Sequence, residues 1–84
     1  MVAFRIEWSD EAQADVRRLD QPTAMRLFDG LLRYALTEVG DVKQLQADLA
    51  GKLRLRVGAH RLFFTRSEGV IRVLAVKHRS EAYR

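Results

Sequence analysis

The sequence has no cysteine, a single proline and no long apolar run. Without cysteine it forms neither disulfide bonds nor thiolate metal sites. No stretch approaches the roughly 20 apolar residues of a membrane-spanning helix, and the N-terminus lacks the basic-then-apolar pattern of a secretory signal. These absences exclude a disulfide-stapled secreted domain and an integral membrane protein, so we expect a cytoplasmic protein.

Acidic residues are scarce in the last part of the chain. Residues 1–51 carry six Lys/Arg against nine Asp/Glu, a balance of −3, whereas residues 52–84 carry nine against two, a balance of +7. Such segregation creates a one-sided field that attracts polyanions. The alternative interpretation is a solvated basic tail. With 84 residues in one continuous pattern, we expect a single domain over 1–84.

The N-terminal half predicts a strand followed by two helices. Residues 3–8 alternate apolar and charged side chains, which predicts a strand with Phe4, Ile6 and Trp8 facing inward. Ser9 is a candidate N-cap for a helix from Asp10 to Leu19. The apolar stripe of this helix consists of Ala12, Val16 and Leu19.

A second helix is predicted to begin at Pro22 and to end at Gly40. Its apolar residues have helical spacing and are Ala24, Leu27, Phe28, Leu31, Leu32, Ala35 and Val39. Two closely linked helices form a helical hairpin. Residues 41–51 fit either a helical turn or an ordered loop.

The C-terminal part predicts three antiparallel strands. Residues 52–57 alternate strictly, Gly58-Ala59 fits a type II′ turn, and the return strand continues to Thr65. A second turn at Glu68-Gly69 leads into residues 70–76. The resulting fold is α+β in the order βααβββ, with the helical hairpin packed on one face of the antiparallel sheet and a cationic opposite face.

This register sorts the side chains into two faces. It sets Arg56 opposite Arg61, Phe64 opposite Val73 and Leu62 opposite Ala75. The apolar face then contains Leu53, Leu55, Leu62 and Phe64. The other face contains Lys52, Arg54, Arg56, Arg61 and Phe63, joined by Arg72, Leu74 and Val76.

Like charges directly opposite each other, such as Arg56 and Arg61, destabilise a sheet. RNA phosphates would neutralise them, and Phe63 is placed to stack on a base or to pack against the sheet. The predicted RNA-binding residues are Lys52, Arg54, Arg56, Arg61, Phe63, Arg72 and Lys77. The tail adds His78, which titrates near neutral pH, and the phenol of Tyr83.

Three segments carry a resemblance to a known family: Asp41–Leu45, Leu53–Phe64 and Val73–Tyr83. Together they resemble the RelE/ParE toxin superfamily over essentially the whole chain. The RelE branch consists of bacterial toxins that cleave mRNA, typically on the ribosome, and the ParE branch acts on DNA gyrase. The resemblance implies a neutralising antitoxin partner, acidic where it covers the cationic face, and no cofactor.

The resemblance also implies site residues. Lys52 and Arg54 match the paired basic residues of the RelE catalytic strand, and Arg61, Arg79 and Tyr83 match other RelE positions. The sequence departs from some relatives, which have lysine where this chain has Arg54 and His78. Tyr83 and the His78-Arg79 pair favour the ribonuclease branch.

RNA supplies its own nucleophile, the 2′-OH, so a metal-independent endoribonuclease needs only to orient it, move two protons and stabilise the charged phosphorane. We expect Arg54, Arg61 and Arg79 to hold the phosphate. Because arginine does not give up its proton, the acid and base candidates are Lys52, His78 and Tyr83. The alternatives are a gyrase-inhibiting toxin and a noncatalytic RNA-binding or interaction domain.

Overall fold

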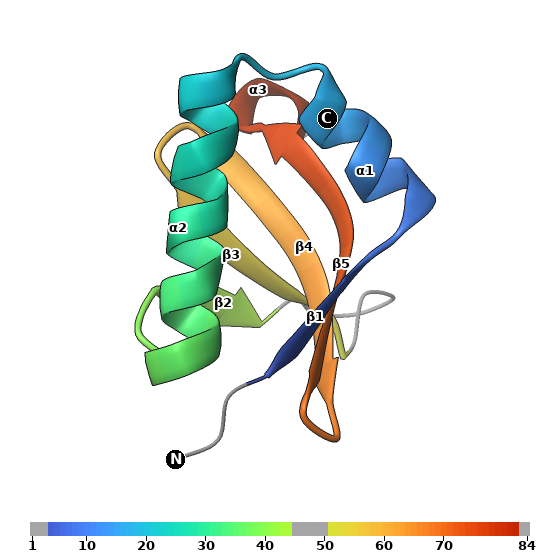
Figure 1. Cartoon of the computed structure of the whole chain (residues 1–84), viewed down its shortest axis with the longest axis vertical. Coiled ribbons are helices and arrows are strands. Elements are labelled where there is room, and N and C mark those ends of the chain that lie inside the picture. Colours follow the sequence, from blue (N-terminus) through green and yellow to red (C-terminus); the bar gives the residue numbers. More distant parts are fainter. Residues whose placement is uncertain (1–3, 45–50, 83–84) are drawn as a thin grey trace.

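The computed structural model describes residues 4–44 and 51–82. Five strands and three helices alternate along the chain: β1 (Arg5–Trp8), α1 (Asp10–Arg17), α2 (Gln21–Thr37), β2 (Asp41–Gln44), β3 (Leu53–Val57), β4 (His60–Ser67), β5 (Val70–His78) and α3 (Arg79–Ala82). The strands form one sheet in the order β1-β5-β4-β3-β2 (Figure 1). All neighbours are antiparallel except β1 and β5, which are parallel.

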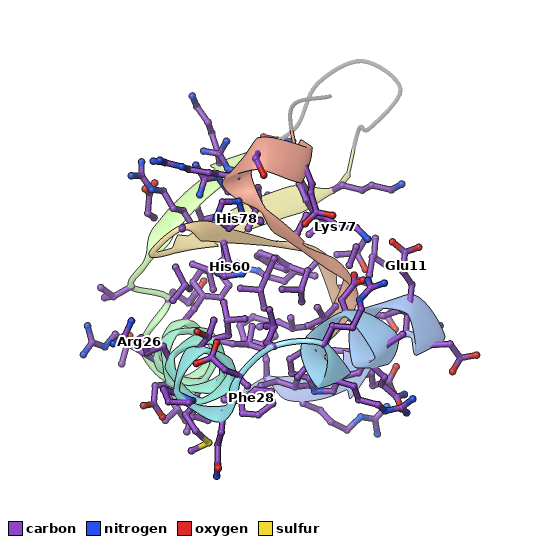
Figure 2. All side chains as sticks on the ribbon, turned by 90° about the horizontal axis from the view of Figure 1, so that it is seen from above. Glu11, Arg26, Phe28, His60, Lys77 and His78 are labelled. Atoms are coloured by element: carbon purple, nitrogen blue, oxygen red, sulfur yellow. The ribbon has the colours of Figure 1, made fainter. Side chains whose placement is uncertain are left out.

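Both long helices lie on one side of this sheet (Figure 2). The α+β class and the helical hairpin on one face are therefore confirmed, and the sequence-based element order lacked only β2 and α3. The core between the layers contains Leu27 and Leu31 of α2 and Leu62, Phe64 and Val73 of the sheet. Among the described residues, no helix is both long and apolar enough to cross a membrane.

The start of α1 follows the predicted cap. The Ser9 hydroxyl accepts a hydrogen bond from the Ala12 amide at 3.1 Å and donates one to the Leu74 carbonyl at 2.7 Å, which ties the cap to β5. Phe4, Ile6 and Trp8 pack against the core as predicted. The helix ends at Arg17 rather than Leu19, although the side chain of Leu19 still packs against the core.

The end of α2 differs from the prediction. Glu38, not Gly40, caps this helix in the left-handed conformation with φ of 58°, and its amide donates to the Tyr34 carbonyl. An ion pair from Glu38 to Arg66 at 2.6 Å holds the cap against β4. The predicted apolar stripe was also partly wrong, because Phe28, Leu32 and Val39 are exposed and Tyr34 is buried instead.

The hairpin between β3 and β4 has the predicted register, with Arg56 opposite Arg61 and Leu55 opposite Leu62. Gly58 in its turn has φ of 59°. Between β4 and β5, the pairing of Phe64 with Val73 is also as predicted.

One prediction about β5 was wrong. An irregularity between Phe63 and Phe64 shifts the register, so that Leu62 pairs with Val76 rather than Ala75. Val76 consequently faces the core, where it is buried, and does not lie on the cationic face. A bulge adds one residue to a strand and so reverses the facing of every residue beyond it.

Candidate nucleic-acid interface

The sheet face opposite the helices gathers cations at its middle. Strand pairing sets Lys43 beside Arg54 and Arg56 beside Arg61, and alternation puts all four on the same face. We call these four residues the middle cluster. Lys52 immediately precedes β3, next to this cluster in the sequence.

Burial strengthens the electrostatics of the middle cluster. Arg61 is only 6% exposed, and Arg54 is half-buried. Charges removed from water interact more strongly than charges at the surface. An acidic group lies nearby at Asp41, whose Oδ2 is 4.0 Å from the Arg56 Nη1. A group of cations held this way is suited to an anion that brings several negative oxygens.

Phe63 continues the same face along β4. It is half-buried and lies between Arg54 on β3 and Ala75 on β5. Below it, Thr65 pairs with Arg72, which lies on the same face and is exposed. The structure therefore brings Arg54, Arg56, Arg61, Phe63 and Arg72 onto one surface, as the sequence predicted.

Lys77 has different surroundings from its cross-strand neighbour Arg61. Its Nζ lies 3.2 Å from the carboxylates of both Glu11 and Asp15 on α1. Partial burial alone would lower the pKa of Lys77, but the hydrogen bonds to these two carboxylates outweigh it and raise the pKa above 10.5. Lys77 thus joins α1 to β5, and its charge is matched before any ligand arrives.

His78 lies apart from the middle cluster. It pairs with His60, in step with Leu62 and Val76, which places both rings on the helix-covered side (Figure 2). The rings meet edge to face with centroids 5.3 Å apart. Desolvation, followed by repulsion from His78, lowers the pKa of His60 below 6.5.

Two further predicted residues belong to the end of the chain. Arg79 begins α3 with an exposed side chain, and its amide donates to the Ala59 carbonyl at 2.8 Å. This bond places the start of α3 beside the β3–β4 turn. Tyr83 lies outside the described residues.

Sequence reasoning missed several members of this surface. Lys43 was hidden in a segment whose structure the pattern left open, although its alternation with Asp41 matches a short strand. Arg5 and Glu7 were assigned only to the outward face of the first strand. Their approach to Arg72 depends on the parallel pairing of β1 with β5, which local sequence does not reveal.

Comparison with known proteins identifies the family. Residues 6–83 match the sequence profile described as the ParE toxin of the type II toxin–antitoxin system parDE. The chain belongs to this toxin family. A comparison with curated proteins gives no significant match.

Solved structures show that this ParE-family toxin has the RelE-like fold. The toxin–antitoxin complex RelBE2 from Mycobacterium tuberculosis contains a chain with 22% identity and a TM-score of 0.74, covering 92% of this toxin and 99% of that chain. The RelE–RelB complex from Pyrococcus horikoshii matches with 19% identity, a TM-score of 0.77, and 95% and 99% coverage. The YoeB dimer from Staphylococcus aureus matches with 20% identity, a TM-score of 0.74, and 92% and 98% coverage.

Proposed function

We propose that this toxin is a metal-independent endoribonuclease that cleaves mRNA on the ribosome. The middle cluster is the observation that supports the proposal. Arg56 directly opposite Arg61 costs folding free energy, and RNA phosphates would compensate that cost with charge-assisted hydrogen bonds. The resemblance of the sequence to the RelE branch supports the same conclusion.

The reaction proceeds by attack of the ribose 2′-OH on the adjacent phosphorus. A base accepts the 2′-OH proton, the bond from phosphorus to the 5′-oxygen breaks, and an acid protonates that oxygen. The products are a 2′,3′-cyclic phosphate and a 5′-hydroxyl. Arg54 and Arg61 stabilise the phosphorane charge, and Arg79 assists from the start of α3.

Lys52 and Tyr83 are the proton carriers in this proposal. The ring of His78 lies on the helix-covered side of the sheet, so we assign it no proton transfer. The ammonium of Lys77 lies between two carboxylates, and its raised pKa makes it a poor proton donor at neutral pH.

The test is cleavage of mRNA in a translating extract, with the 5′-hydroxyl ends mapped. Replacing Arg54 by Ala removes a positive charge from the phosphate site, and we expect cleavage to fall about 100-fold. Arg33→Ala removes one charge from the exposed surface of α2 and serves as the matched control, with cleavage unchanged. Equal cleavage by wild type and Arg54→Ala would contradict the assignment, and RNA binding without any cleavage would indicate a noncatalytic domain.

Gyrase inhibition is the second candidate, and the match to the ParE profile over residues 6–83 favours it. A supercoiling assay with purified gyrase separates the two activities. Loss of supercoiling with intact mRNA would replace the ribonuclease proposal by this one.

The partner in either case is an antitoxin encoded with the toxin. Several solved relatives were determined as complexes with antitoxins. Two surfaces of this chain are suited to such a partner: the middle cluster, for an acidic segment, and an exposed apolar stripe along α2, for apolar side chains. The stripe consists of Met25, Phe28, Leu32, Leu36 and Val39. Co-expression with the neighbouring reading frame, followed by copurification, tests this.

A further inference from the structure

The open face of the sheet has a second polar region below the middle cluster. A hollow of about 590 Å³ lies over the lower ends of β1, β4 and β5. The groups that matter here are the side chains of Arg5, Glu7, Thr65, Ser67 and Arg72. Thr65 and Ser67 continue the outward row of Arg61 and Phe63 along β4, so one extended ligand can reach both regions.

The charge of the hollow differs from that of the middle cluster. Two arginines, Arg5 and Arg72, are balanced by two glutamates, Glu7 and Glu68. The Glu7 carboxylate lies between the guanidinium groups, 2.8 Å from Arg5 and 3.8 Å from Arg72. A phosphate would have to approach this carboxylate at close range, and like charges repel. The hollow is therefore poorly suited to the RNA backbone.

A nucleobase fits the hollow better than a phosphate. Backbone contacts position a nucleic acid, whereas hydrogen bonds to base edges specify its sequence. Bases in single-stranded RNA expose their Watson–Crick edges to protein side chains. The hollow offers carboxylate acceptors, guanidinium donors and two hydroxyls within one small area, which is the mixture that a base edge requires.

Guanine is the base whose edge complements this arrangement. Its adjacent N1–H and N2–H₂ groups donate to the two oxygens of one carboxylate, and its O6 accepts from an arginine. Uracil presents one N–H between two carbonyl oxygens, which would face the Glu7 carboxylate with like partial charges. Donors on the base matched to Glu7 and an acceptor matched to Arg72 give the preference its physical basis.

We propose that this hollow reads a guanine near the cleaved bond, with Glu7 as the specificity-determining residue and Arg72 as its partner. The inference rests on the proposed RNA-cleaving function. From Arg61 to Thr65 is four residues, or roughly 13 Å along a strand, which separates the read base from the phosphate site. Phe63 lies between them and stacks on the intervening base.

The experiment compares two RNAs: a short oligouridine, and the same oligomer with one central guanosine. Binding to the full-length toxin is followed by fluorescence anisotropy at fixed salt. We expect wild type to prefer the guanosine oligomer by roughly fivefold or more. Glu7→Gln should abolish this preference while leaving oligouridine affinity unchanged or slightly higher, because one negative charge is lost.

Asp29→Asn is the matched control. It removes one negative charge from the exposed surface of α2, so it reports the general electrostatic gain, and the guanosine preference should persist. Equal affinity of wild type for the two oligomers, or an unchanged preference in Glu7→Gln, would overturn the inference. Thermal unfolding of each variant confirms that the fold is retained.

The outcome is separable from that of the proposed function. Guanosine-selective binding with no mRNA cleavage overturns the ribonuclease proposal but retains the hollow as a base-reading site. Cleavage of mRNA without base preference at this position does the reverse. A wild-type toxin that binds neither oligomer overturns both.

Discussion

Arg61 and Lys77 are cross-strand neighbours with the same charge and opposite surroundings. Arg61 faces another arginine, Arg56, within the middle cluster. Lys77, by contrast, is held by two carboxylates of α1. The comparison shows that a count of positive charges does not separate cations that stabilise the fold from cations suited to a ligand. Only the acids that surround each cation make the distinction.

The carboxylate of Asp15 is expected to contribute most to the stabilising side. It is 3% exposed and accepts hydrogen bonds from the Val76 amide at 2.9 Å, from Lys77 and from Arg18. Val76 lies beyond the last residue that β1 pairs, so Asp15 takes the place of a strand neighbour. Asp15→Ala leaves a buried amide without its acceptor, and we expect the free energy of unfolding to fall by about 3 kcal/mol.

Urea denaturation measures this change. Asp29→Ala, which truncates an exposed carboxylate on α2, should change the free energy of unfolding by less than about 0.5 kcal/mol. A loss below about 1 kcal/mol in Asp15→Ala would show that α1 is held to β5 by its apolar contacts alone.

Lys77→Met tests the other partner of the same contact. The aliphatic part of the side chain is kept, so the loss is limited to the ion pairs, and we expect about 1 kcal/mol of destabilisation. The pKa of folded Lys77 is raised above 10.5. Its contribution is therefore complete below pH 10.5 and is lost as the pH rises through the folded value.

RNA affinity should distinguish this variant from Arg54→Ala. Because Glu11 and Asp15 already match the charge of Lys77, we expect Lys77→Met to change RNA affinity less than twofold, whereas Arg54→Ala weakens it severalfold. Equal losses of affinity in both variants would remove the distinction between the two groups of cations.

Much of the fold was predictable because local patterns determine it. Ser9 has the residue type and position of a cap, and the alternation around Gly58-Ala59 fixed the hairpin register, including Arg56 opposite Arg61. The bulge in β5 was not predictable, since no residue type marks it. The apolar stripe on α2 was misassigned because periodicity identifies apolar side chains but not which of them a partner, rather than the core, would cover.

The candidate site was predictable to the extent that alternation controls it. Arg54, Arg56 and Arg61 share a face because they lie two residues apart or opposite each other. Lys77 and His78 were grouped with them by nearness in the sequence. The acids of α1 that hold Lys77 and the register that turns His78 toward His60 are tertiary features, which the order of residues does not contain.

A smaller effect of the opposite sign is expected in the middle cluster. Arg56→Thr removes the like-charge pair with Arg61 and places a residue suited to strands on β3. Its exposed ion pair with Asp41, at 4.0 Å, contributes little. We expect a gain of about 0.5 kcal/mol in unfolding free energy together with weaker RNA binding. A loss of stability would show that Arg56 supports the fold, as Lys77 does.

The pair of His60 and His78 is a conditional version of the arginine pair, since it carries like charges only when both rings are protonated. Desolvation and the neighbouring His78 lower the pKa of His60 below 6.5, and the attraction of Asp20 and Glu81 does not compensate. The unfolded chain therefore binds a proton at His60 more readily than the folded chain does. This contribution to stability is present above pH 6.5 and is lost as the pH falls through the folded pKa.

The loss on acidification should be the smallest of these effects, below about 0.5 kcal/mol once solvent screening is included. Urea denaturation at about pH 7.5 and pH 5.5 measures it, and NMR titration of the His60 ring locates the midpoint, which should lie below 6.5. His60→Gln keeps a polar side chain without the charge and should flatten the dependence over this range. A His60 midpoint above 6.5 would mean that Asp20 and Glu81 dominate. The histidine pair would then resemble Lys77, held by nearby acids, and not the opposed arginines of the middle cluster.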